Sequence, residues 1–143
     1  MKSLMIVEDA LTKISSLLAQ NSYVKFAYIF GSCARGDVGP LSDIDIAVCL
    51  DGRVSPFDFR LRLSAELAHA LGSEHFDLVT LNDAPLLLKY EVVRGGRVIK
   101  EDKNKRVAFE TRTLSEYLDT ACLRRTQRTY LKEQLAQGGT FGQ

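Results

Sequence analysis

Two aspartates stand one residue apart in an otherwise apolar run. Asp43 and Asp45 open the segment "DIDIAVCL", in which Ile44 and every second residue after it are aliphatic. A strand places residues i and i+2 on one face, about 7 Å apart, so that both carboxylates can bind one cation. Facing carboxylates repel each other without a cation, and hard cations such as Mg²⁺ prefer oxygen ligands. The pair therefore predicts a divalent-metal site.

A second group of residues, upstream of the aspartates, is suited to phosphate. Gly31 interrupts an apolar run and permits a sharp turn, and Ser32 offers a backbone N–H and a hydroxyl. If "SCARG" begins a short helix, its free N–H groups can bind phosphate, and Arg35 is a weaker candidate for the same role. A phosphate-binding turn beside a metal pair is what phosphoryl or nucleotidyl transfer from a nucleoside triphosphate requires.

Asp77, in the segment "HFDLVTL", is the candidate for a third carboxylate. With it, the site can hold two Mg²⁺ ions about 3.5–4 Å apart, one for the attacking hydroxyl and one for the triphosphate. Alone, an aspartate after a polar loop is often only a surface residue. Whether Asp77 belongs to the metal site therefore depends on the third strand lying beside the second. The lone histidines His69 and His75 have no metal-ligand spacing and are interpreted as structural or solvent-facing.

The elements that position these residues follow from hydrophobic periodicity. Their order predicts a mixed β-sheet with helices packed against it, an α/β (α+β) fold in a single domain over 1–143 with a flexible C-terminal tail. We expect helices over about 7–20, 56–71, 82–94 and 105–136, strands over 23–30, 43–50 and 74–81, and an edge strand over 97–100. The predicted buried side of the last helix comprises Phe109, Leu114, Tyr117, Leu118 and Ala121.

Composition excludes several classes of protein. The chain has 143 residues, 45% of them hydrophobic and 26% charged, which is ordinary for one compact domain. Its net charge of +1 provides no global attraction to nucleic acid or an anionic membrane. Cys33, Cys49 and Cys122 lack metal-ligand spacing, and we expect reduced thiols. Without a secretory signal or a membrane-spanning run, a soluble cytoplasmic protein is expected.

A local basic cluster lies near the C-terminal end of the last predicted helix. It comprises Arg124, Arg125, Arg128 and Lys132. Three interpretations stay open: a face for an acidic partner, a face for RNA, or simply a solvated helix end, which is the commonest role of such a run.

The combined pattern resembles a known superfamily. Gly31-Ser32, ten residues, and then Asp43-x-Asp45 resembles the signature of the DNA polymerase β-like nucleotidyltransferases, and "FDLVTLNDAP" afterwards is similar to its minimal nucleotidyltransferases (MNT). The resemblance implies a polymerase β palm-like fold in which Gly31 and Ser32 hold the triphosphate of ATP. It further implies that Asp43 and Asp45 bind both Mg²⁺ ions, and that Asp77 binds the catalytic ion and assists deprotonation of the acceptor.

The same resemblance implies a partner, since MNT proteins are commonly the antitoxins of HEPN/MNT toxin–antitoxin pairs. The implied activity is transfer of AMP to a tyrosine of the cognate HEPN toxin, a small helical ribonuclease. Two alternatives stay open, an antitoxin that acts by binding alone and a small-molecule nucleotidyltransferase of the aminoglycoside type. The intact motif disfavours the first alternative. The lack of length for an extra acceptor-binding domain disfavours the second.

Overall fold

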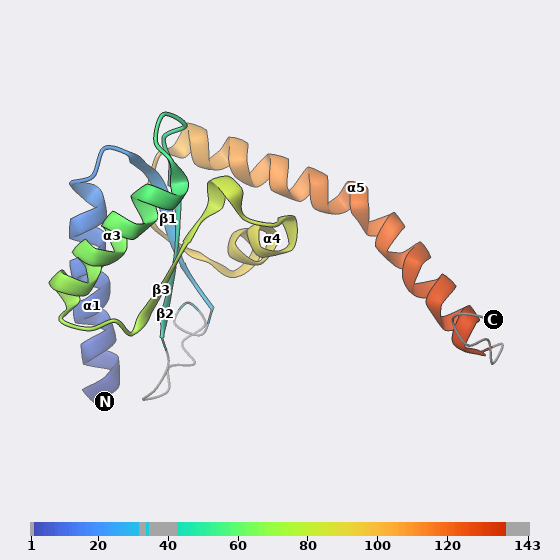
Figure 1. The fold of residues 1–143 in the computed structure, drawn as a ribbon, viewed down its shortest axis with the longest axis horizontal. Coiled ribbons are helices and arrows are strands. Elements are labelled where there is room, and N and C mark those ends of the chain that lie inside the picture. The colour runs from blue at the N-terminus through green and yellow to red at the C-terminus, as the bar shows by residue number, and fades with distance from the viewer. Residues whose placement is uncertain (1, 32–33, 35–42, 137–143) are drawn as a thin grey trace.

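A computed structural model describes residues 2–31, 34 and 43–136 (Figure 1). Four strands form one sheet, and the helices cover it from both sides. In chain order the elements are α1 (Lys2–Ala19), β1 (Val24–Phe30), β2 (Ile44–Leu50), α3 (Pro56–Leu71), β3 (Phe76–Thr80), the 3₁₀ turn η1 (Leu81–Asp83), α4 (Leu86–Gly95), β4 (Arg97–Lys100) and α5 (Lys103–Ala136).

The sheet has the strand order β3-β2-β1-β4 and mixed directions. β1 runs antiparallel to β2 and to β4, whereas β2 and β3 are parallel. The parallel pair is joined by α3, because parallel neighbours need a crossover connection long enough to return the chain to the same end. The predicted mixed sheet with flanking helices is confirmed.

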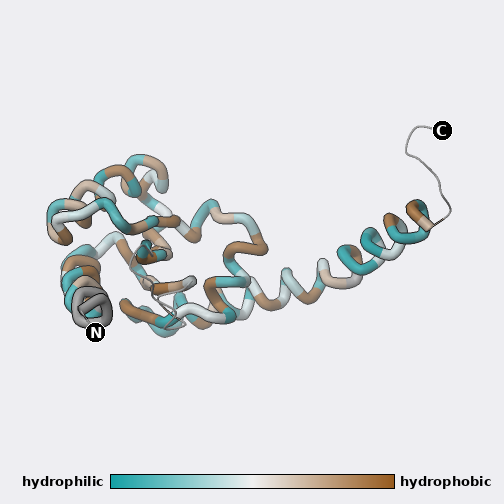
Figure 2. Tube along the Cα trace, turned by 90° about the horizontal axis from the view of Figure 1, so that it is seen from below, coloured by the Kyte–Doolittle hydropathy of each residue, from teal (hydrophilic) through white to brown (hydrophobic). Residues whose placement is uncertain are grey.

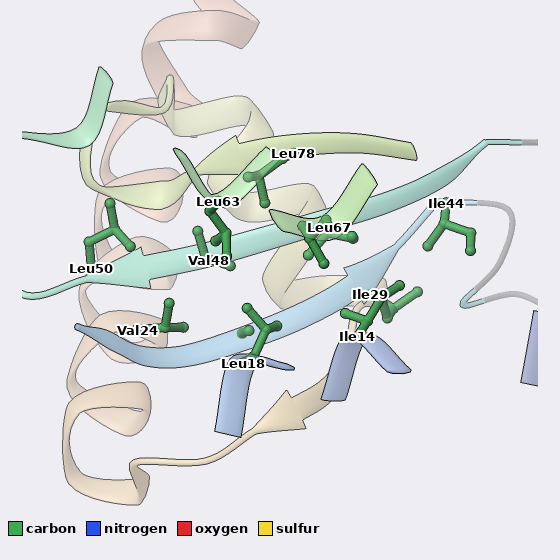
Figure 3. Close-up of a cluster of buried hydrophobic side chains, with 12 residues drawn as sticks. Ile14, Leu18, Val24, Ile29, Ile44, Val48, Leu50, Leu63, Leu67 and Leu78 are labelled. Carbon is green, nitrogen blue, oxygen red and sulfur yellow. The ribbon is translucent and has the colours of Figure 1, made fainter. Parts of the chain in front are cut away.

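The central strands separate two cores. Along β2, Ile44, Ile46 and Val48 pack into a core beneath α1 and α3, which Figure 3 shows in close-up. Ala47 on the opposite face belongs to a second core, beside Phe26, Tyr28, Leu81 and Val92. The predicted period-2 alternation of this strand is therefore confirmed. Because Asp45 is two residues before Ala47, its side chain lies on the face that α4 and α5 cover.

Two predicted helix boundaries are wrong. α1 begins at Lys2, several residues before the expected start near residue 7. α4 begins at Leu86 after Pro85, not at Asn82. The Asn82 side chain instead accepts a hydrogen bond from the Leu50 N–H (2.8 Å) and donates one to the Leu50 carbonyl (2.9 Å). Asn82 thus ties the segment after β3 to the end of β2, which leaves it no helix-capping role.

The buried side of α5 also differs from the prediction. Leu114 and Leu118 are 41% and 69% exposed, whereas the polar Thr113 is buried. Phe109 packs against Phe26 of the sheet. The buried side of α5 therefore includes Thr113, which the pattern of apolar residues could not identify because threonine is polar. Within the described part of the chain, no helix is both long and apolar enough to cross a membrane.

A hydrogen-bonded network fixes the base of α5 on the sheet. The Tyr28 hydroxyl donates to Glu110 (2.7 Å), and Arg106 donates to Glu110 (2.9 Å) and to Glu101 (2.7 Å). Burial, reinforced by the Glu110 carboxylate, raises the pKa of Tyr28 well above its ordinary value. The phenol therefore stays a neutral donor, and the direction in which α5 leaves the sheet is set at its first turns.

Candidate active site

Gly31 and Asp45 bring the two predicted halves of the site together. Gly31 follows β1 with a φ of +72°, the left-handed conformation that glycine adopts without steric cost. A Cβ at this position would collide with Asp45 Oδ2 and lie 3.3 Å from Asp45 Cγ. The predicted glycine turn is confirmed. Only a residue without a side chain fits between this turn and the carboxylate.

Asp45 and Asp77 are direct register partners on neighbouring parallel strands. Parallel strands lie about 4.8 Å apart, and residues in direct register project from the same face of the sheet. Asp45 is half-buried and Asp77 is exposed, so the pair opens toward solvent at the edge of that face. The condition set for Asp77, that the third strand lie beside the second, is met.

Asp43 lies at the same end of the sheet, immediately before β2, and is exposed. Its Oδ1 is 3.8 Å from His75 Nδ1, and the His75 carbonyl accepts a hydrogen bond from the Ile44 N–H (3.3 Å). His75 is solvent-facing, as expected, but its place beside Asp43 was not predicted. The available signal was its position two residues before Asp77, which the parallel register of β2 and β3 converts into contact with Asp43.

Ser32 and Arg35, the other predicted phosphate-binding residues, lie outside the described residues, as does the short helix expected at "SCARG". The described residues contain no ready-made cluster of three or more His, Cys, Asp or Glu side chains in metal-binding arrangement. The roles of Asp43, Asp45 and Asp77 as metal ligands therefore stay predictions, supported by register and by shared face.

The residues present fit a divalent cation and a phosphate chain. Asp43, Asp45 and Asp77 place three hard oxygen donors at one end of two adjacent strands, which suits Mg²⁺. The collision that a Cβ at Gly31 would cause shows that the turn lies directly against the Asp45 carboxylate. A triphosphate held by the turn would therefore lie beside the carboxylates.

The opposite end of β2 has a different character. Asp51 follows the strand there, with Arg53 Nη2 at 2.9 Å and Lys25 Nζ at 3.5 Å from Oδ2. The hydrogen bonds from Arg53 hold the pKa of Asp51 well below its usual range. A cavity of about 630 Å³ near this end lies between α1 and α3, with Tyr23 and Phe59 in its lining. Arg53 and Lys25 therefore balance the charge of Asp51, and this end of β2 is separate from the site that Asp45 and Asp77 form at the other end.

Comparison with known proteins gives a family and several relatives. Residues 12–105 match the family model described as Polymerase beta, Nucleotidyltransferase. The protein adenylyltransferase MntA of Shewanella oneidensis is 35% identical over 106 residues, which are 73% of this chain and 75% of that protein.

Two solved structures extend the comparison to the fold. A chain of a toxin–antitoxin crystal structure with AMP-PNP matches with a TM-score of 0.72 at 31% identity, covering 85% of this chain and 98% of that one. A chain of the structure of tri-AMPylated Shewanella oneidensis HEPN toxin in complex with MNT antitoxin matches with a TM-score of 0.68 at 28% identity, covering 88% and 98%.

Proposed function

Since the chain belongs to the Polymerase beta nucleotidyltransferase family, we propose that it is an ATP- and Mg²⁺-dependent protein adenylyltransferase. Its proposed substrate is a tyrosine hydroxyl of a cognate HEPN ribonuclease toxin, which the attached AMP inactivates, so that the chain acts as an antitoxin. The names of its relatives support both parts, since one is a protein adenylyltransferase and another is an MNT antitoxin in complex with an AMPylated HEPN toxin.

The observation that carries the proposal is the register of Asp45 and Asp77. Their pairing on adjacent parallel strands, with Gly31 against Asp45, puts carboxylate oxygens and a glycine turn at one sheet end, and this supports the proposed roles in metal and phosphate binding. A binding module that only covered its toxin would need neither the paired carboxylates nor the close glycine. A catalytic site needs both, because charge develops on the phosphates as the reaction proceeds.

The proposed reaction forms a bond between the tyrosine oxygen and the α-phosphorus of ATP and breaks the bond from that phosphorus to the β-phosphate oxygen. AMP becomes attached to the phenol, pyrophosphate leaves, and the phenolic proton passes to a base. Bound Mg²⁺ supplies charge neutralisation for the phosphates and the attacking oxygen. Asp43, Asp45 and Asp77 would hold the ions, and Asp77 lies on the exposed outer strand, where it can assist removal of the phenolic proton. Gly31 and Ser32 would bind the triphosphate.

We further place this reaction in the cytoplasm, where ATP is available and thiols stay reduced. Cys49, a free cysteine in the described part of the chain, supports a reducing compartment. Burial raises the pKa of its thiol, so that it remains an uncharged core side chain with no role in the proposed transfer.

The test is direct. The purified chain is incubated with ATP, Mg²⁺ and the HEPN protein encoded by the neighbouring gene, and the intact mass of both proteins is measured. We expect the mass of the HEPN protein to increase by whole AMP units and its ribonuclease activity to fall in parallel. Neither change should occur in EDTA or with Asp45→Asn.

The two alternative functions have different signatures in the same experiment. An antitoxin that acts by binding alone would inhibit the ribonuclease in a stoichiometric complex without any mass change, with or without ATP. A small-molecule nucleotidyltransferase would leave the HEPN protein unmodified and active, and would instead consume ATP with an aminoglycoside acceptor. Either result would overturn the proposed activity.

A further inference from the structure

The distal segment of α5, residues 125–136, extends away from the rest of the molecule. Both views show the C-terminal half of this helix leaving the body as an arm (Figures 1 and 2). Every residue of the segment is exposed except Gln134, which is half-buried and hydrogen-bonded to the Tyr130 hydroxyl. At 1.5 Å per residue, the segment adds about 18 Å of helix beyond the body.

The aromatic contact of α5 with α4 lies at Tyr117, before the distal segment begins at Arg125. Tyr117 stacks on Tyr90 of α4, with ring centroids 3.6 Å apart, and the Arg124 guanidinium lies 4.1 Å from the Tyr117 ring centroid. Arg124 also donates to the Tyr117 carbonyl (3.0 Å). The stacked rings fix α5 on α4 near Tyr117, and the contacts of Arg124 reinforce the following turns of α5 itself.

The distal segment is amphipathic. Tyr130, Leu131 and Leu135 are 58%, 47% and 68% exposed. Leu131 and Leu135, four residues apart, share one side of the helix with the intervening Gln134. Figure 2 shows hydrophobic and hydrophilic positions alternating along this arm. Exposed apolar side chains at this spacing are suited to bind a partner, because they gain free energy when they are covered.

A basic row flanks this stripe. Arg125, Arg128 and Lys132 follow the spacing i, i+3, i+7 on the adjoining side of the helix, and Glu133 is the single acidic residue of the segment. A second copy of the chain would bring its own basic row against this one in a symmetric contact, and like charges would oppose the pairing. The occupant must instead supply carboxylates beside an apolar groove. That requirement also disfavours RNA, which offers phosphates but no matching apolar surface.

We propose that the distal segment is a docking arm for the protein substrate, which it binds through an acidic, apolar groove on a helical surface. The inference rests on the proposed function. The family match ends at residue 105, so the distal segment lies outside the region that matches the nucleotidyltransferase family. By holding the acceptor protein, the arm would raise the effective concentration of its hydroxyl at the carboxylate site.

The test uses the full chain, the HEPN protein of the neighbouring gene, ATP and Mg²⁺. Leu131→Asp with Leu135→Asp should raise the KM for the HEPN protein at least about tenfold and leave kcat within about twofold, because binding is lost and chemistry is not. Arg125→Glu with Arg128→Glu should also raise the KM, and the KM should lose or reverse the increase with salt that the wild-type chain shows, because salt screens the attraction that these arginines supply. Leu118→Asp is the matched control, since Leu118 is 69% exposed on another side of the same helix.

Several other outcomes would overturn the docking proposal, and one would overturn only the proposed function. Unchanged KM in the distal variants, with transfer intact, would refute the arm and leave the proposed function standing. An equal increase in KM with Leu118→Asp would show that the distal stripe is not the surface that binds the HEPN protein. A chain that is dimeric alone and monomeric after Leu131→Asp would assign the arm to a second copy. If the chain binds anionic vesicles or RNA and not the HEPN protein, and the distal variants lose that binding, the arm would be assigned to those partners. If the wild-type chain binds the HEPN protein through the arm but transfers no AMP, only the proposed function fails.

Discussion

Gly31 is packed so closely against Asp45 that no side chain fits between them. A Cβ on Gly31 would overlap Asp45 Oδ2, and the glycine already has a φ of +72°. The close contact makes the position of the turn and the orientation of the carboxylate depend on each other. Any substitution at Gly31 must displace one of the two, which connects the proposed phosphate-binding turn to the strand that carries the proposed metal ligand.

Gly31→Ala should abolish AMP transfer while the protein still folds. The left-handed backbone costs about 1–2 kcal/mol with a Cβ, and the collision with Asp45 adds displacement of the carboxylate. Chemical denaturation measures the first effect and the transfer assay measures the second.

Gly72→Ala separates these two effects. Gly72 has a φ of +66° at the end of α3, and a Cβ there would have no neighbour within 4 Å. The Gly72→Ala variant should therefore lose about as much stability as Gly31→Ala and keep full transfer activity. Loss of activity in both variants would attribute the effect of Gly31 to general destabilisation.

Replacing the carboxylates one at a time tests the metal assignment. Asp45→Asn and Asp77→Asn should each lower kcat by about 100-fold or more, because several kcal/mol of charge stabilisation in the transition state is lost. The stability of both variants should change little, since the site end of the sheet is open to solvent. Binding of Mg²⁺, followed by calorimetry, should weaken in parallel.

Asp51→Asn is the matched control for that series. Asp51 lies at the other end of β2 and is paired with Arg53 and Lys25. Its replacement should leave transfer and Mg²⁺ affinity unchanged. Normal transfer by the Asp45→Asn variant would show that this carboxylate is not a metal ligand.

The features that could be predicted from the sequence depend on local chemistry. Alternation along β2 predicted which face carries Asp45, and the break in an apolar run predicted the turn at Gly31. The helix predicted over 56–71 ends as expected, and Gly72 after it adopts the left-handed conformation typical of a glycine at a helix C-terminus. In each case a few neighbouring residues determine the conformation.

The features that could not be predicted depend on tertiary contacts. The contact of His75 with Asp43 exists only because β3 is parallel to β2 in one register. Asn82 was assigned to a helix start from its capping preference, yet it bonds to Leu50, 32 positions away. Thr113 is buried although a threonine contributes nothing to an apolar pattern. Pairing across the fold overrode local preference at all three positions.

Tyr28→Phe should lower stability and remove one component of its pH dependence. The phenol hydrogen bond to Glu110 contributes about 1.5–3 kcal/mol because its acceptor is charged. The pKa of Tyr28 is raised by burial and by Glu110, so the folded state keeps its proton where the unfolded chain, with a pKa near 10, loses it. The contribution of Tyr28 to the free energy of unfolding is therefore complete below pH 10 and decreases above it.

Denaturation of both proteins at pH 8 and pH 10.5 checks this expectation. The difference in unfolding free energy between wild type and Tyr28→Phe should be larger at pH 8. A difference that grows with pH would contradict the raised pKa of Tyr28. The comparison cancels the titration of the other tyrosines, which both proteins share.

Lys100→Met should loosen the end of α1. Lys100 Nζ donates to the carbonyls of Leu18 (2.7 Å) and Asn21 (2.6 Å), which satisfy acceptors at the helix terminus. Burial, with a smaller effect of Lys25, lowers the pKa of the Lys100 ammonium, so part of the gain from its two hydrogen bonds is offset by desolvation. The methionine keeps the apolar stem, and each carbonyl keeps one backbone donor, the Asn21 N–H for Leu18 and the Val24 N–H for Asn21. A net loss of about 1–2 kcal/mol is expected from the two lost hydrogen bonds. Hydrogen exchange should accelerate in the last turn of α1 while transfer activity is retained.

Lys25→Met is the control, since it removes only a partly exposed ion pair with Asp51 and should cost less than about 1 kcal/mol. An equal loss of stability in the two variants would contradict the capping role of Lys100.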